Sequence, residues 1–293
     1  MTKHVKYVML ALLFIFFSTL LMAHTASAKT YYVSTRGRDN GPGTKQRPWK
    51  TLSYAANRVR AGDTVRIARG TYKPFRIRRG GSRRSPVTFE ADSGARGRVV
   101  IRGNETYGLA VWSADHVVIN GLTVDGARGW AFYVRESDHV TLRNSTVKNS
   151  GRSCVSYNRS NFGRIENNRI HRCGRRGPNG EGIYLGSAGG RRDRSRGHVV
   201  RNNRIYDTRD EAVDIKPNTR DISVERNEIY DIRLRDGGAI HVRGTGHSIR
   251  NNRITNVRRR RGGLGPGIDS DARNVRISGN RMSRTAGCRG RGC

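Results

Sequence analysis

The sequence contains few acidic residues and little cysteine, and these shortages limit the classes of protein to which it can belong. Asp and Glu number 23 against 57 Lys and Arg in 293 residues, which gives a formal net charge of +34. Four cysteines are too few for a small disulfide scaffold, and a single long apolar run excludes a membrane protein with several spans. Glycine is abundant, at 36 residues, but follows no three-residue period, so collagen is excluded as well.

The N-terminus has the pattern of a secretion signal. Lys3 and Lys6 make a basic start, residues 8–22 are mostly apolar, and residues 26–28 read Ala-Ser-Ala, a small-residue cleavage site. We therefore expect residues 1–28 to be a signal peptide, the alternative being an uncleaved anchor. The rest of the chain is then exported, as a secreted or periplasmic monomer without a membrane span.

Export also bears on the cysteines, because disulfides form in oxidising compartments. Cys154 and Cys173 can pair with each other. Cys288 and Cys293 can pair or stay free, since the sequence alone does not fix the connectivity.

One pattern recurs along the second half of the chain: apolar-x-x-Asn-x-apolar, then a polar turn and a short alternating strand. It is centred on five asparagines spaced 24 to 35 residues apart: Asn168, Asn203, Asn227, Asn252 and Asn280. Gly121 and Ser145 hold the same place in earlier repeats. Alternation with a period near 24 fits a coil of three short strands, and stacked coils lie about 4.8 Å apart, so the Asn amides can hydrogen-bond along the stack. We predict an all-β, right-handed parallel β-helix of roughly eight to ten coils; the alternative is that Asn merely marks turns.

The front of the chain differs from the repeat. Residues 51–59 form an expected amphipathic helix with Thr51 as its N-cap. Because a solenoid exposes the apolar end of its stack, we expect this helix to cover that end. No comparable segment closes the other end, since residues 288–293 are short and polar. We therefore expect a single domain over residues 29–293, with a strand and cap over 29–72 and coils over 73–293.

Alternation along the strand that follows each Asn repeat places polar side chains on one outer face. Two neighbouring columns result. The first contains Tyr133, Ser156, Tyr184, Asp214, His241 and Asp269, and the second contains Arg135, Asn158, Lys216, Arg243 and Asp271. Acidic residues precede these strands: Glu181, Asp210, Glu211 and Asp236. One face therefore collects carboxylates, a lysine, a histidine, arginines and tyrosines.

This set suits β-elimination on a uronic-acid polymer, which needs a base at C5 and a group that neutralises the sugar carboxylate. Lys216 is the only lysine after Lys148, and lysine can release a proton where arginine cannot. Repulsion from Arg243, one coil away, favours the neutral amine, and Asp214 opposes it. The plainer alternative is that Asp214 and Lys216 form an ordinary solvated pair.

The remaining candidates share the same face. His241 is a third catalytic candidate, with a stacked surface histidine as the alternative. Carboxylates on this face can hold a Ca²⁺ that neutralises the sugar carboxylate. Tyr133, Arg135 and Tyr184 are predicted to bind substrate, although aromatic ladders also occur for structural reasons.

Several short segments of the N-terminal part carry a resemblance to a known family. They are Tyr31-Tyr-Val-Ser34, Gly41-Pro-Gly-Thr44, Pro48-Trp-Lys-Thr-Leu52, Ala61-Gly-Asp-Thr64 and Gly70-Thr-Tyr72. They resemble the opening of secreted parallel β-helix proteins, a superfamily that includes polysaccharide lyases of the chondroitinase B, alginate lyase and family 9 pectate lyase types. The resemblance covers most of the exported chain and implies the fold more strongly than the activity.

The resemblance also implies roles for individual residues. In the chondroitinase B and alginate lyase group, a metal-binding Glu lies five residues before the catalytic Lys, and a catalytic Arg follows one coil later. Here Glu211, Lys216 and Arg243 stand at those positions. The chain departs from the group in three ways: Arg209 replaces a second metal-binding Glu, no His separates Arg243 from Gly244, and the chain is shorter than typical members. Asn179, Glu181 and Asp214 are the nearest substitutes for the missing ligand, so the resemblance implies a Ca²⁺ site formed by Glu181, Glu211 and Asp214.

The sequence therefore predicts an exported protein that acts on an acidic polysaccharide, by β-elimination or C5 epimerisation, with Ca²⁺ as cofactor. The alternative is a non-catalytic β-helix that binds envelope or matrix polyanions, as the positive charge favours. Nucleic acid is not an expected partner, since no nucleic-acid-binding module is visible. The Asn-Thr-Asp, Asp-Asp and Gly-His-Gly motifs of β-helical polygalacturonases are absent, which disfavours hydrolysis.

Overall fold

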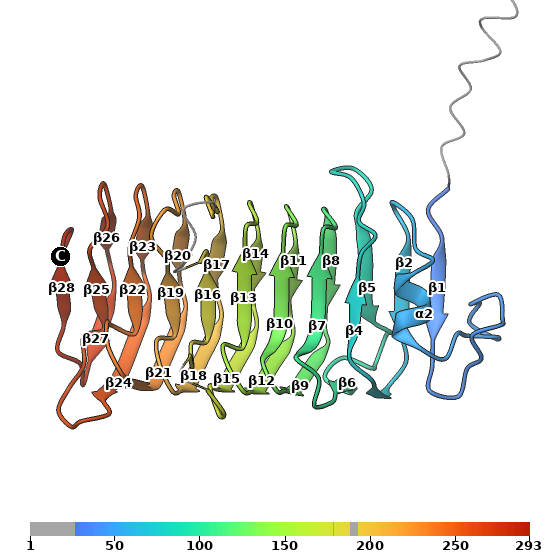
Figure 1. Cartoon of the computed structure of the whole chain (residues 1–293), viewed down its shortest axis with the longest axis horizontal. Coiled ribbons are helices and arrows are strands. Elements are labelled where there is room, and N and C mark those ends of the chain that lie inside the picture. The colour runs from blue at the N-terminus through green and yellow to red at the C-terminus, as the bar shows by residue number, and fades with distance from the viewer. Residues whose placement is uncertain (1–26, 178, 188–192) are drawn as a thin grey trace, which may run out of the picture.

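The computed structural model describes residues 27–177, 179–187 and 193–293, and these residues form an elongated stack of parallel coils (Figure 1). Most of the predicted signal peptide lies outside the described residues. Three parallel sheets run the length of the stack, and most coils give one strand to each sheet. The predicted all-β parallel β-helix is thus confirmed, with nine or ten strands in each sheet.

Sheet A contains ten strands: β1 (Thr30–Val33), β2 (Thr64–Ile67), β5 (Val87–Ala91), β8 (Val117–Asn120), β11 (Thr141–Arg143), β14 (Arg164–Glu166), β17 (Val199–Arg201), β20 (Ser223–Glu225), β23 (Ser248–Arg250) and β26 (Arg276–Ser278). Sheet B contains nine: β3 (Gly70–Tyr72), β6 (Val99–Arg102), β9 (Thr123–Ala127), β12 (Thr146–Ser150), β15 (Arg169–Cys173), β18 (Arg204–Thr208), β21 (Glu228–Leu234), β24 (Arg253–Arg259) and β27 (Arg281–Ser283). Sheet C contains nine: β4 (Phe75–Ile77), β7 (Tyr107–Trp112), β10 (Trp130–Arg135), β13 (Val155–Asn158), β16 (Ile183–Leu185), β19 (Val213–Ile215), β22 (Ile240–Val242), β25 (Ile268–Ser270) and β28 (Cys288–Gly290).

The core is a set of aliphatic columns inside the coil. In sheet C, Ile183, Val213 and Ile240 are successive register partners, and all three are fully buried. Because side chains alternate along a strand, fixing this column inward fixes its neighbours outward. The register therefore decides which polar residues share the outer face of sheet C.

The predicted Asn ladder is present at the bend between sheets A and B. Asn168 Nδ2 donates to Asn203 Oδ1 at 3.0 Å, and the same contact links Asn203 to Asn227 and Asn227 to Asn252, also at 3.0 Å. Each amide also donates to a main-chain carbonyl, as Asn227 does to Val200. The ladder thus satisfies buried backbone groups at a sharp bend, which the alternative of unlinked turn residues would not do.

The place of the earliest repeat is corrected by the register. Ser145 joins the ladder, since its main-chain N–H donates to Asn168 Oδ1 at 3.0 Å. Its partner one coil earlier is Leu122 rather than Gly121, because Thr123 pairs with Thr146. Gly121 instead holds the preceding position, where φ is +75°, a conformation that glycine adopts without strain.

A short helix, α2 (Leu52–Ala56), lies at the N-terminal end of the stack (Figure 1). The Thr51 side chain accepts a hydrogen bond from the Tyr54 N–H, as expected of an N-cap. The helix is shorter than predicted because the chain leaves it at Asn57, and the fully buried Val59 packs from the following turn instead.

Two disulfides join Cys154 to Cys173 and Cys288 to Cys293. At the C-terminal end, β28 adds a last strand to sheet C in a segment that the sequence did not predict to be a strand. Within the described residues, no helix has the length and apolar character needed to cross a membrane.

Candidate functional site

The outer face of sheet C holds the predicted polar columns in register. Tyr184 pairs with Asp214, Asp214 with His241, and His241 with Asp269. Each strand therefore places one of these side chains beside its neighbour on the next coil, about 4.8 Å away. The parallel ladder thereby brings together residues that are 27 to 30 positions apart in the chain.

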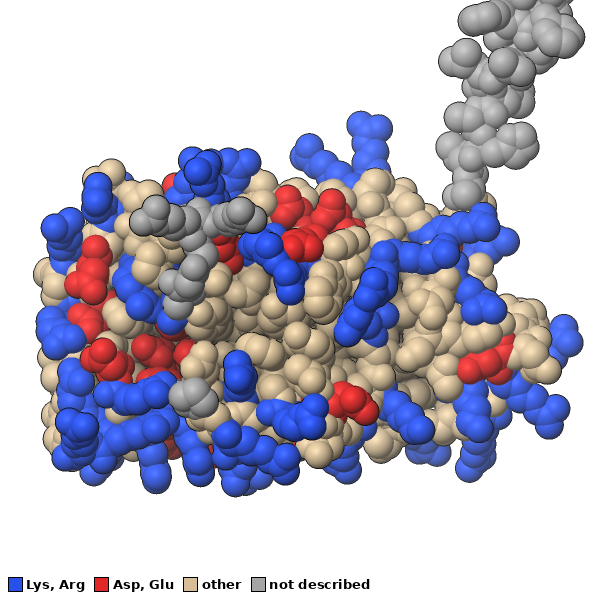
Figure 2. All heavy atoms as spheres, viewed as in Figure 1, with Lys and Arg blue, Asp and Glu red and all other residues tan. Residues whose placement is uncertain are grey.

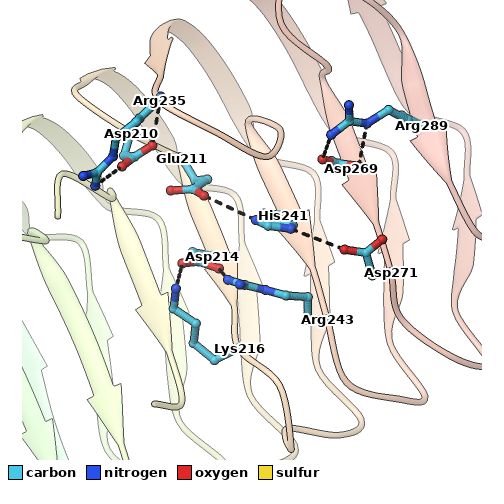
Figure 3. A network of polar contacts seen from close by, with 10 residues as sticks. All are labelled: Asp210, Glu211, Asp214, Lys216, Arg235, His241, Arg243, Asp269, Asp271 and Arg289. Carbon is cyan, nitrogen blue, oxygen red and sulfur yellow. Dashed lines mark hydrogen bonds and ion pairs between the residues drawn. The ribbon is translucent and has the colours of Figure 1, made fainter. Parts of the chain in front are cut away.

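Asp214 is the centre of a polar cluster that we define as Tyr184, Glu211, Asp214, Lys216, His241 and Arg243, all but the first of which are drawn in Figure 3. Its side chain is only 1% exposed, and its two carboxylate oxygens contact Lys216 Nζ and the Arg243 guanidinium. Lys216 Nζ also lies 4.6 Å from the centroid of the Tyr184 ring. One carboxylate is therefore shared by two cations, and the amine and guanidinium that the sequence predicted to be neighbours do meet on this face.

Glu211 and His241 form a second pair beside Asp214 (Figure 3). His241 Nδ1 lies 3.3 Å from Glu211 Oε1, and its Nε2 lies 3.9 Å from the exposed Asp271 carboxylate. Burial, reinforced by the charges of Asp214 and Asp210, raises the pKa of Glu211 to about 7, although the hydrogen bond to His241 opposes the shift. The imidazole is thus held between two acids at the edge of the cluster.

Two more buried carboxylates lie next to Glu211. Glu181 Oε2 accepts a hydrogen bond from Ser153 Oγ at 2.6 Å, and burial raises the pKa of Glu181. Asp210 is paired with Arg235 at 3.0 Å. Burial disfavours the charged forms of Glu181 and Glu211, and a bound cation would stabilise those charged forms.

The carboxylates that could hold a metal differ in part from the predicted set. Oxygen atoms of Glu181, Asp210 and Glu211 lie within 4.8 Å of one another, and a second group of the same size joins Glu211 to Asp214 and His241. An all-oxygen set is the donor type that Ca²⁺ prefers, so the first group fits that ion. Asp214 belongs to the second group and contacts Lys216 and Arg243, and Asp210, which the sequence analysis did not propose as a ligand, belongs to the first group and contacts Arg235.

A family model shows where this arrangement belongs. The model described as "Pel9A-like, right handed beta helix region" matches residues 31–250. The chain belongs to this Pel9A-like family. The match spans the N-terminal cap and the coils that carry Glu181, Asp214, Lys216 and Arg243.

Curated relatives match over shorter stretches. Pectate lyase PEL9 of Emericella nidulans is 30% identical over 112 residues, which is 36% of this chain and 27% of that protein. The uncharacterized protein YwoF of Bacillus subtilis is 34% identical over 101 residues, or 32% of this chain and 21% of that protein. Each match thus spans about a quarter of the length of the relative.

Solved structures share the fold at low sequence identity. An alginate lyase from Paenibacillus sp. str. FPU-7 superposes with a TM-score of 0.68 at 19% identity, covering 89% of this chain and 97% of that one. The pectate lyase Pel9A gives 0.66 at 18% identity, covering 85% of this chain and 68% of that one. A rhamnogalacturonan lyase gives 0.66 at 17%, covering 85% and 73%.

Not all predicted residues of this Pel9A-like chain lie in the cluster. Tyr184 does, but Tyr133 and Arg135 lie on β10, three coils from β19 in the same sheet. Tyr133 is 8% exposed and is packed among Tyr107, Trp112 and Trp130. The sequence analysis missed Tyr107 and Trp112, although their register with Trp130 and Arg135 places them in the same columns.

Proposed function

We propose that this protein cleaves an acidic polysaccharide by β-elimination, with Lys216 as the base. The observation that carries the proposal is the buried Asp214 carboxylate, which holds Lys216 and Arg243 side by side on an outer face. Of these two side chains only the lysine can serve as a base, because arginine does not release its proton. The names of the structural neighbours, which include alginate, pectate and rhamnogalacturonan lyases, support the same substrate class.

In the proposed reaction, Lys216 Nζ takes the proton from C5 of the uronate unit. The electron pair of the C5–H bond forms the C4=C5 double bond as the C4–O bond to the next sugar breaks, and the leaving oxygen receives a proton. Arg243 stabilises the negative charge that develops on the sugar carboxylate. His241, held between Glu211 and Asp271, is the group assigned to return a proton to the leaving oxygen.

The same proton abstraction serves C5 epimerisation, in which a proton returns to the opposite face of C5 and no bond to C4 breaks. The two reactions differ only in the fate of the intermediate. The cluster supports both, because both require a base and a stabilised carboxylate.

A Ca²⁺ ion would be held by Glu181, Asp210 and Glu211. Bound there, it would supply positive charge against the carboxylate of the sugar. These carboxylates are buried and close together. The low dielectric constant of a buried site strengthens their electrostatic attraction for a cation.

We also propose that the protein is exported. The two disulfides and the N-terminal secretion pattern support this location. Export would place the site where extracellular polysaccharides are found.

A second candidate function is non-catalytic binding of polyanions. It is favoured by the net charge of +34, and the ion pair between Asp214 and Lys216 is compatible with it. Figure 2 shows Lys and Arg side chains along the whole length of the visible face, whereas Asp and Glu form separate groups. Such a surface attracts anionic polymers whether or not they react.

The deciding experiment incubates the purified protein with alginate, polygalacturonate, rhamnogalacturonan and chondroitin in the presence of Ca²⁺. A lyase forms an unsaturated product that absorbs in the ultraviolet, and Lys216→Met abolishes that product. Lys148→Met is the matched control, because Lys148 pairs with Asp125 on another sheet. Incorporation of deuterium at C5 without absorbance identifies an epimerase, and neither signal on any substrate leaves polyanion binding.

A further inference from the structure

The N-terminal coils of sheet C carry an aromatic group outside the cluster. It consists of Tyr107, Trp112, Trp130 and Tyr133, which we call the aromatic platform. The ring centroids of Tyr107 and Tyr133 lie 4.7 Å apart and those of Trp130 and Tyr133 lie 5.2 Å apart. Both tryptophans are partly exposed, whereas Tyr133 is buried beneath them. The platform therefore packs through the buried Tyr133 and reaches solvent at its two tryptophans.

Three guanidinium groups lie over the indole rings of the platform. Arg76 and Arg135 lie 4.9 and 4.8 Å from the Trp112 ring centroid, and Arg152 lies 4.9 Å from that of Trp130. Arg76 and Arg135 come from β4 and β10, the strands on either side of β7, which carries Trp112. The indole is thus flanked by two cations about 10 Å apart along the stack.

Contact with an aromatic ring restricts a guanidinium without using its hydrogen-bond donors. Arg135 also contacts Glu136 at 3.4 Å, but Glu136 is shared with Arg159 at 2.7 Å, so positive charge remains in excess there. A groove of about 480 Å³ borders the platform and is lined by Arg76, Tyr107 and the acidic Glu105, among others. A concave surface that combines an aromatic ring with fixed hydrogen-bond donors is typical of a ligand site.

Part of the platform shares its columns in sheet C with the cluster around Asp214. Arg76 pairs with Ala110 and Ala110 with Tyr133, and the same column continues to Tyr184 and Asp214. Three coils separate β10 from β19, or roughly 14 Å. A ligand that follows the columns must therefore extend over several sugar units to contact both places.

We propose that the aromatic platform with Arg76, Arg135 and Arg152 is a distal binding site for the carboxylates of an acidic polysaccharide chain. The inference rests on the proposed function for the class of ligand, but it concerns binding and holds whether or not the chain is cleaved. A planar guanidinium group donates two parallel hydrogen bonds to a carboxylate. Spaced along the stack, they match a polymer that repeats a carboxylate along its length, and they do not match a neutral glycan.

Tryptophan fluorescence tests the proposal without any need for turnover. The chain has three tryptophans, and Trp49 is buried in the N-terminal cap, so the other two report on the platform. The probes are hexasaccharides and disaccharides of polygalacturonate and alginate, with neutral cello-oligosaccharides as the comparison. We expect the acidic hexasaccharides to change the fluorescence at saturation and to bind more tightly than the disaccharides.

Substitutions then assign the effect, with affinity also measured by calorimetry. Trp112→Ala and the double variant Arg76→Lys with Arg135→Lys should each weaken acidic hexasaccharide binding about tenfold or more. Tyr206→Ala is the matched control, since Arg169 and Arg204 lie over that ring on sheet B. If Trp112→Ala lowers the melting temperature, the lysine variant decides, because it keeps both the ring and the charge.

Three results would overturn the inference: unchanged affinity in the lysine variant, equal binding of neutral and acidic hexasaccharides, or an equal loss in the Tyr206→Ala control. Failure of the proposed function has a different signature. In that case no product forms on any polymer, yet the hexasaccharide still binds and the platform variants still weaken it.

Discussion

The bend between sheets A and B and the outer face of sheet C are built from the same coils but differ in what they repeat. The bend places Asn in five successive coils, from Asn168 to Asn280. The outer face changes at every coil, from Tyr184 to Asp214 to His241. Repetition serves a task that is the same in each coil, the satisfaction of buried backbone groups. Variation marks the face on which each coil contributes a different side chain.

The largest expected effect is the loss of activity caused by a substitution on the outer face of sheet C. Lys216→Met should lower the rate of product formation on the responsive polymer by about 10²- to 10⁴-fold, the usual contribution of a general base. The rate is measured under conditions in which the variant is folded by circular dichroism. Near wild-type activity in this variant would remove Lys216 from the mechanism.

A substitution in the Asn ladder, at the bend between sheets A and B, should lower the stability of the fold and leave the proposed chemistry unaffected. Asn227→Ala leaves the Asn203 amide and the Val200 carbonyl without their partner, so the free energy of unfolding should fall by about 2–4 kcal/mol. Denaturant unfolding measures the loss, and the exposed Asn104→Ala is the control with little effect. Similar losses in both variants would mean that the ladder contributes no special stability.

A buried histidine at the bend before sheet A should make the stability of the protein depend on pH. His198 is fully buried, its Nδ1 accepts a hydrogen bond from the Gly163 N–H, and burial lowers its pKa to about 4. The unfolded chain takes up this proton near pH 6.5 and the folded chain only near pH 4, so stability falls as the pH drops through that window, by roughly 3 kcal/mol in all.

Thermal unfolding from pH 7 to pH 4 measures the effect. His198→Asn should remove this part of the decline, whereas the exposed His139→Asn should leave it in place. Equal pH profiles for wild type and His198→Asn would show that other groups cause the acid instability.

The smallest expected effect is the stabilisation of the fold by a cation bound at the carboxylates on the outer face of sheet C. Ca²⁺ should raise the melting temperature, and the stabilisation reaches about 2.7 kcal/mol when the ion is at 100 times its Kd. Glu181→Gln should remove most of the rise, while Glu228→Gln, on an exposed pair with Arg204, should not. A rise that is equal in all three proteins would place the ion elsewhere.

The sequence was informative wherever a physical requirement repeats. The Asn spacing predicted the solenoid and its ladder, and the strand alternation predicted the column that joins Tyr184, Asp214 and His241. These predictions succeed because the period of two and the coil spacing leave little freedom. The length of α2 was less predictable, because the burial of Val59 from a turn depends on tertiary packing.

Side-chain partners could not be predicted in the same way. That Asp214 contacts both Lys216 and Arg243 depends on rotamers and burial, which a one-dimensional pattern does not encode. The place of Asp210 beside Glu181 and Glu211 depends on the turns that precede β16 and β19. Tyr107 and Trp112 were missed because they precede the first clear Asn repeat, and only the register with β10 reveals them.

Because the strands of sheet C stack in register, the number of coils between two sites sets the distance between them. Insertion of one complete coil between β13 and β16 would move the aromatic platform about 4.8 Å farther from Asp214 and leave both intact. Duplication or loss of a coil during evolution could therefore tune how long a polymer must be before it is recognised, in discrete increments and without redesign of either end.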